Sequence, residues 1–189
     1  IENFDVNQIV NAIAYEIDRG GQVFFVQHNI SGLGRIARRI RSIFPKLNIE
    51  VAHGKMLSDE LESVMLRMYR GDVDVLVSTT IIGAGLDLPN VNTILINNAH
   101  LYGLSQLYQM RGRVGRSSQQ AYCYLLIPGT DVSPEAHERL RTIQHNTALG
   151  SGYDIALRDL ELRGGGNLFG KEQSGHLATV GFHLYCKIV

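Results

Sequence analysis

The strongest constraint on the fold is an alternation of short apolar runs with segments whose apolar residues recur every three or four positions. The run QVFFVQ at 22–27 is typical of a strand that is covered on both faces. The spacing of Ile36, Ile40 and Ile43 is typical of an amphipathic helix, which Pro45 ends. Similar apolar runs predict further strands at 49–53, 74–78, 93–96 and 122–127. The alternation predicts an α/β fold with a mostly parallel sheet covered by helices on both faces.

A helical pattern at 5–19 precedes the first of these strands, and further helical patterns lie between strands, from Ser58 onward and around 104–111. After Pro128 the pattern changes. The sequence Ser133-Pro134-Glu135 combines an N-cap, a proline at the first helical position and an acid in the first turn. A helix to about 146 and a second one at roughly 153–162 predict a helical hairpin. We therefore expect a sheet domain at 1–130, followed by a hairpin and a loop at 131–189.

Charge is balanced, with 18 basic and 18 acidic side chains, so any contact with nucleic acid must come from a local surface. The arginines around Ile36 and Ile40 are either a solvated helix face or a face that follows phosphates. No apolar run approaches the roughly 20 residues of a membrane span, and no signal peptide is visible. We expect a cytoplasmic protein without a membrane partner. The histidines and both cysteines lack metal-ligand spacing, so we expect no metal site in this chain.

The octapeptide QMRGRVGR at 109–116 carries three arginines and two glycines. Guanidinium groups match phosphate oxygens, and glycines permit close approach of the backbone. A loop that cradles nucleotide phosphates is missing, however. The segment GGNLFGKE at 165–172 has the required glycines and lysine but ends in Glu172, where a hydroxyl is needed. Without an acidic DExx motif as well, we expect the chain alone to be inactive toward ATP with Mg²⁺. The octapeptide remains a contact to phosphate held elsewhere, an RNA-contact loop or a solvated turn.

Four segments together resemble motifs of superfamily 2 helicases and translocases. TTIIGAGLDLP at 79–89 and QMRGRVGR resemble motifs V and VI, in the expected order and near the expected spacing. HGKM at 53–56 resembles the turn ahead of motif V, and GGQVFFVQHN at 20–29 resembles motif IV. The resemblance implies the second RecA-like motor domain of such a protein. The first motor domain, with its phosphate loop and DExx box, is then expected upstream.

The C-terminal part narrows the resemblance. RDLELRGGGNLFG at 158–170 and EQSG at 172–175 resemble the TRG motif of RecG-type fork helicases and of the bacterial transcription-repair coupling factors, the Mfd family. The closing GHLATVGFHLYCKIV is more similar to the Mfd family. This resemblance implies half of an ATP-dependent translocase on double-stranded DNA that displaces stalled RNA polymerase. RNA polymerase and excision-repair proteins would be contacted through other domains.

The resemblance also implies roles for residues that match the motifs. Arg113 and Arg116 correspond to arginines that reach the ATP phosphates across the interdomain cleft, Arg116 as the finger. Gln109 lies beside them in the motif. Gly85 and Asp87 correspond to residues near the nucleotide, with Asp87 near the ribose.

Other matching residues are implied to contact DNA or to couple ATP hydrolysis to movement. Thr79, with Thr80 beside it, corresponds to a hydroxyl that holds a DNA phosphate, and Gly54 and Lys55 lie at a turn that can touch the backbone. Such contacts are independent of base sequence and sensitive to salt. The coupling residues would be Arg163 and Gln173 of the TRG motif. For Arg139, on the first hairpin helix, a role in DNA contact or coupling and a salt-bridged surface role both remain open.

One departure from the family pattern lies in motif V, where Gly83-Ala84 replaces a glutamate and a small hydroxyl residue. A glycine there can loosen the loop between Thr79 and Asp87. Two alternatives to a translocase of the Mfd type therefore stay open. One is a RecG-type fork-remodelling helicase, and the other is a binding module of the same fold that does not hydrolyse ATP.

Overall fold

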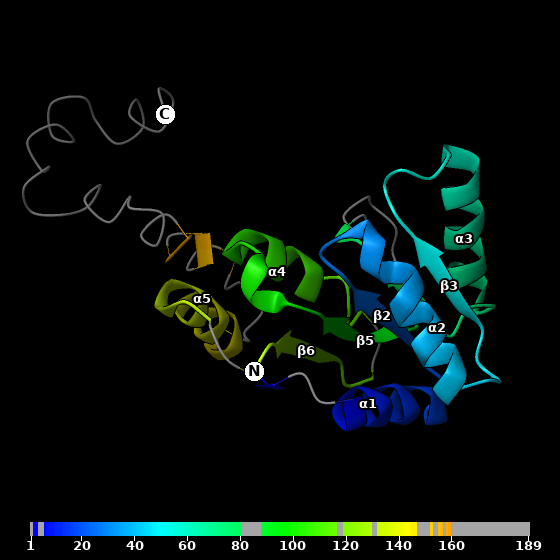
Figure 1. The fold of residues 1–189 in the computed structure, drawn as a ribbon, viewed down its shortest axis with the longest axis horizontal. Helices are drawn as coiled ribbons and strands as arrows, with labels where there is room; N and C mark the ends of the chain where they lie inside the picture. The colour runs from blue at the N-terminus through cyan, green and yellow to red at the C-terminus, as the bar shows by residue number, and fades with distance from the viewer. Residues whose placement is uncertain are drawn as a thin grey trace, which may run out of the picture.

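A parallel sheet forms the centre of the molecule, with helices against both of its faces (Figure 1). The computed structural model describes residues 6–80, 88–116, 119–129 and 132–146, the backbone of 2–3, and residues 152, 155, 156, 158 and 159. The strand order is β1-β6-β5-β2-β4-β3, with all pairs parallel. The strands are β1 (Glu2–Asn3), β2 (Gln22–Val26), β3 (Ile49–Ala52), β4 (Val75–Ser78), β5 (Val91–Ile96) and β6 (Tyr122–Ile127). The predicted parallel α/β sheet is confirmed, and β1 was not predicted because two residues carry no periodicity.

The helices divide between the two faces of the sheet. One face carries α1 (Val6–Asp18) and α2 (Leu33–Ile43). The other carries α3 (Ser58–Arg70), α4 (Leu104–Arg111) and α5 (Pro134–His145). Short 3₁₀ turns, η1 (Ile30–Gly32) and η3 (Ala99–Leu101), follow β2 and β5.

Strand β2 shows why its apolar run is continuous. All five of its residues are buried, and successive side chains of a strand point to opposite faces. Phe24 and Val26 pack in the core under α3, α4 and α5, whereas Val23 and Phe25 pack in the core under α1 and α2. A strand buried on both faces must therefore be apolar at every position.

The start of α5 agrees with its sequence signature. The Ser133 hydroxyl accepts a hydrogen bond from the backbone N–H of Ala136 at 3.2 Å, and proline occupies the first turn. Leu140 and Ile143 of α5, with Ile155 of the following segment, belong to the same core as the sheet residues. Most of the second predicted hairpin helix and all of 160–189 lie outside the described residues, and the boundary at 130 stays a prediction.

Candidate functional site

Four predicted DNA-contact residues lie at one edge of the sheet, where parallel strands β3 and β4 end. Ala52 is in register with Ser78, and the backbone N–H of Thr79 donates to the Ala52 carbonyl at 3.3 Å. The turn after β3 is closed by the Met56 N–H, which donates to the His53 carbonyl at 3.1 Å. The residues that these bonds bring together are Gly54, Lys55 and Thr80, which are exposed, and Thr79, which is half-buried.

The same edge has a polar link that we did not predict. The Gln27 side-chain oxygen, which follows β2, accepts a hydrogen bond from the Asn97 amide after β5 at 2.7 Å. The backbone N–H of Gln27 also donates to the carbonyl of Ser78 at 2.8 Å. These bonds join the ends of three neighbouring strands, so the carboxyl edge is held together by more than the sheet itself. In the sequence, the amide side chain that directly follows each of these two apolar runs could have indicated this link.

The arginines Arg113 and Arg116 lie at the opposite edge of the sheet. Helix α4 follows the carboxyl end of β5 and leads back to the amino end of β6. Gly115 there has a φ of 79°, and a Cβ at this position would lie 2.9 Å from Cβ of Ala121, the residue before β6. Arg113 and Arg116 and the predicted DNA contacts are therefore on separate edges of one sheet.

The arginine side chains at this amino edge differ in exposure. Arg116 is exposed, and its Nε and Nη2 donate to the Gly112 carbonyl, each at 3.3 Å. Arg113 is half-buried, and Gln109 is exposed one turn earlier on α4. Gly85 and Asp87 lie outside the described residues. Leu88, which follows them, is buried and accepts a hydrogen bond from the Val91 N–H at the start of β5.

Arg111, the remaining arginine of the octapeptide, points into the protein. Its Nη1 donates to the carbonyl oxygens of Ile143 at 2.9 Å and Asn146 at 2.6 Å, at the end of α5. Its guanidinium also lies 5.2 Å from the ring centroid of Tyr108. Arg111 therefore joins α4 to α5, and Arg113 and Arg116 are the arginines of the octapeptide that stay predicted phosphate contacts.

Residues 5–118 match the model of the helicase conserved C-terminal domain. The chain belongs to this family. Its transcription-repair-coupling factor relatives include that of Mycobacterium tuberculosis, 46% identical over 98% of this chain and 15% of the relative. The Staphylococcus aureus protein of the same name is 47% identical over 96% of this chain and 16% of its own length.

Solved helicase structures also resemble this chain. A structure of RecG bound to a three-way DNA junction matches with a TM-score of 0.73 and 40% identity, over 86% of this chain and 21% of that chain. The Mycobacterium smegmatis helicase Lhr, bound to single-stranded DNA and AMP-PNP, matches with a TM-score of 0.58 at 17% identity, which shows the fold alone. It covers 72% of this chain and 18% of the Lhr chain.

The segment after α5 also packs on α4 of the helicase domain. The Ser105 hydroxyl donates to Oδ2 of Asp159 at 2.6 Å, and Asp159 is buried. A Cβ at Gly152 would lie 3.1 Å from the Tyr108 hydroxyl. An ion pair between Arg158 and Glu138 joins this segment to α5. The helix that leads to Arg113 and Arg116 is therefore held by the hairpin region.

Of the predicted coupling residues, Arg139 is described and Arg163 and Gln173 are not. Nη2 of Arg139 donates to the His100 carbonyl at 3.0 Å, so the side chain joins α5 to η3. Burial lowers the pKa of His100, and the nearby charges of Arg139 and His28 lower it further. Arg139 is therefore part of an internal contact, and its coupling role stays a prediction.

The part of the chain that the structure describes contains neither a cluster of metal ligands nor a membrane-spanning helix. No group of three or more His, Cys, Asp or Glu side chains in that part of the chain could hold a metal ion. None of the helices described is both long enough and apolar enough to span a membrane.

Proposed function

We propose that this helicase domain is the second motor domain of an ATP-dependent translocase on double-stranded DNA, acting in transcription-coupled repair. The observation that supports this most is the separation of Arg116 from Lys55 and Thr79 on opposite edges of one sheet. A single rigid layer can then meet a nucleotide at one edge and a DNA backbone at the other. The chain spans about one-sixth of the length of the coupling-factor relatives it matches, so the remaining parts lie elsewhere in such a protein.

The amino edge fits a role toward ATP that is held by another domain. Arg116 is exposed, and its long hydrogen bonds to the Gly112 carbonyl are ones that phosphate oxygens can replace. ATP with Mg²⁺ supplies the phosphoryl-transfer chemistry when it is bound mainly by the upstream RecA-like domain. Closure of the two domains would bring the Arg116 guanidinium to the charge that develops on the phosphate, with Arg113 and Gln109 orienting it. Gly85 and Asp87, which match motif V, would also contact the nucleotide.

The carboxyl edge fits a phosphate backbone. Lys55 and Thr80 are exposed there, and Gly54 allows close approach of the turn. Contacts of this kind hold duplex DNA without reading its sequence. We propose that the hairpin, through Arg139 and through Arg163 and Gln173 of the TRG motif, transmits closure of the motor to movement along DNA. RNA polymerase and excision-repair proteins would bind through other domains of the protein, and the stalled polymerase would be displaced. We propose that the protein is cytoplasmic.

Substitution of the proposed finger tests the motor assignment. In the full-length protein, Arg116→Ala should lower DNA-stimulated ATP hydrolysis by roughly 10³-fold or more, with little change in DNA affinity. Arg70→Ala is the matched control, because Arg70 is an exposed arginine at the end of α3. Equal and measurable hydrolysis rates for wild type and Arg116→Ala would remove the finger role. No DNA-stimulated hydrolysis by the wild type would instead favour a module that does not hydrolyse ATP.

A RecG-type helicase is the second candidate, because the RecG structure matches with a TM-score of 0.73. The two functions make different demands on the same motor. A coupling factor should release RNA polymerase stalled on linear duplex DNA in an ATP-dependent way. A RecG-type enzyme should instead remodel a branched DNA junction and leave the stalled polymerase in place.

A further inference from the structure

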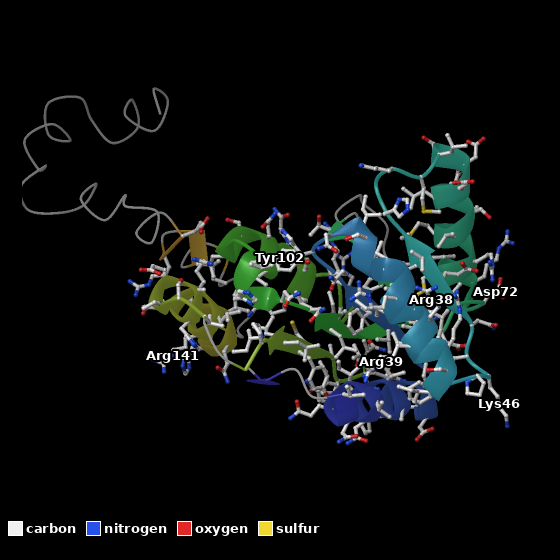
Figure 2. All side chains as sticks on the ribbon, viewed as in Figure 1. Arg38, Arg39, Lys46, Asp72, Tyr102 and Arg141 are labelled. Carbon is white, nitrogen blue, oxygen red and sulfur yellow. The ribbon has the colours of Figure 1, made fainter. Side chains whose placement is uncertain are left out.

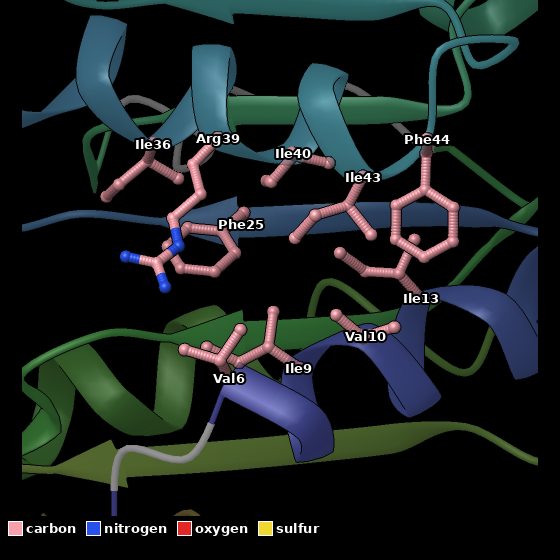
Figure 3. Close-up of a pocket in the computed structure, with 10 residues that line it drawn as sticks. All are labelled: Val6, Ile9, Val10, Ile13, Phe25, Ile36, Arg39, Ile40, Ile43 and Phe44. Carbon is pink, nitrogen blue, oxygen red and sulfur yellow. The ribbon is translucent and has the colours of Figure 1, made fainter.

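An apolar groove separates α1 from α2, on the face of the sheet opposite α4 (Figure 3). Ile13, Phe25 and Ile40 form its buried floor. Val10 and Ile43 lie along its walls, and the side chain of Ile43 is 40% exposed. The groove is shallow, with a cavity volume of about 50 Å³, and is open to solvent on one side. Contact of these apolar walls with water is unfavourable, and the free energy falls when an apolar group covers them.

The rim of this groove is positively charged on one side. Arg39 of α2 lines the groove together with the apolar residues (Figure 3). Arg35 is exposed one helical turn earlier, and residues four apart lie on the same side of a helix. Helix α2 contains four arginines and no acidic residue. The exposed residues of α1 near its start, Asn7 and Asn11, are neutral.

The combination of apolar floor and arginine rim indicates what can bind. A DNA backbone would satisfy the arginines but would leave the apolar walls uncovered. If α2 served only as a solvated face, a partly exposed apolar side chain such as Ile43 would not be expected beside an open groove. An amphipathic helix satisfies both features, because its apolar side chains recur on one face and carboxylates can lie beside them.

We infer that this groove binds an amphipathic helix of a separate partner protein, with acidic residues along one flank. The aliphatic side chains of the partner helix, spaced i, i+3 or i+4, and i+7, would enter the groove between Val10 and Ile43. Carboxylates one turn apart on the partner would then lie over Arg35 and Arg39. From Ile36 to Ile43 the groove follows roughly 10 Å of α2, which is about two turns of the partner helix. Because α4 is on the opposite face, this inference does not depend on the proposed motor role.

Two designed peptides and one DNA duplex test the inference on the full-length protein. The first peptide is a labelled amphipathic helix with leucines at the groove positions and glutamates on one flank. The second has lysines in place of the glutamates, and the third probe is a labelled duplex of random sequence. By fluorescence anisotropy, the acidic peptide should bind at least tenfold more tightly than the basic peptide, and its affinity should fall as salt rises.

Substitutions in α2 locate the binding. Arg39→Glu should lower the affinity for the acidic peptide at least tenfold and raise the affinity for the basic peptide. Ile43→Ser should weaken both, and its circular dichroism and melting temperature show whether the domain is still folded. Arg38→Glu is the matched control, because Arg38 is an exposed arginine of the same helix that does not line the groove (Figure 2).

Three results would overturn the inference. One is equal binding of the acidic and basic peptides. Another is an equal loss of affinity for the acidic peptide in Arg38→Glu and Arg39→Glu. The third is loss of duplex affinity in Arg39→Glu without any binding of the acidic peptide, which would instead identify α2 as a face that follows phosphates. Arg39→Glu keeps the test decisive if Ile43→Ser does not fold, since Arg39 is exposed.

Discussion

Arg111 of α4 donates a hydrogen bond to the backbone carbonyl of Ile143 in α5 at 2.9 Å. The same nitrogen reaches the carbonyl of Asn146, which follows the end of α5. Helix C-termini leave carbonyl groups without partners inside the helix, and a positive charge there is favourable. The arginine that precedes the predicted phosphate contacts thus completes the end of the first hairpin helix. Under the proposed motor function, this bond is a direct link through which a movement of α4 would reach α5.

Removing this link should uncouple the two helices. Arg111→Ala leaves the Ile143 and Asn146 carbonyls without their charged donor, which we expect to destabilise the protein by about 1–3 kcal/mol. The measurement is urea unfolding, combined with hydrogen exchange of the α5 amides, which should become faster. Arg141→Ala, at an exposed position of α5, is the control and should change stability by less than about 0.5 kcal/mol. Unchanged exchange in α5 would show that Arg111 is not its anchor.

Gly21 should tolerate no side chain, in contrast to Gly34 in α2. A Cβ at Gly21 would lie 1.7 Å from Oε1 of Glu16, a buried carboxylate that also accepts a hydrogen bond from the Thr93 hydroxyl. Glu16 cannot move away cheaply, so Gly21→Ala should cost about 1–3 kcal/mol of unfolding free energy. Gly34→Ala has no atom within 4 Å of the new Cβ and should stabilise α2 by about 0.4–1 kcal/mol. Equal melting temperatures for the two variants would contradict this.

The sequence was sufficient to predict the sheet and most helix positions, because those depend on local periodicity. Strand β6 (Tyr122–Ile127) and α4 (Leu104–Arg111) have the predicted bounds. Contacts between distant residues were not predictable in the same way. The bond from Gln27 to Asn97 spans 70 residues, and the inward direction of Arg111 depends on where α5 packs. Side chains of one type in one octapeptide have different partners because tertiary packing decides which of them is covered.

Lys55 should contribute one phosphate contact to DNA binding. Each contact releases counterions from DNA, so Lys55→Ala should reduce the slope of log affinity against log salt by about 1. The affinity should fall by a similar factor for DNA duplexes of different sequence, since a phosphate contact reads no base. Lys46→Ala is the control, because Lys46 is exposed before β3, at the opposite edge of the sheet (Figure 2). Identical slopes for the two variants would exclude Lys55 from the DNA interface.

The thiol of Cys123 should be unreactive in the folded protein. Burial raises its pKa from an ordinary value of 9.0 to about 12, with Arg111 nearby acting in the opposite direction. At pH 8 the thiolate population is then about 10³ lower than in the unfolded chain, and the thiolate is the reactive form. In a Cys186→Ser variant, iodoacetamide should modify Cys123 slowly at pH 8 and rapidly in concentrated urea.

The same shift makes stability depend on alkaline pH. The folded state holds the Cys123 proton to a higher pH than the unfolded state does, so this contribution is complete below about pH 9 and is lost as the pH rises toward 12. The expected result is a decrease in unfolding free energy between pH 9 and 11 that is smaller in Cys123→Ser. An identical pH profile for Cys123→Ser and the parent protein, or fast labelling at pH 8 without urea, would show that the thiol is open to solvent.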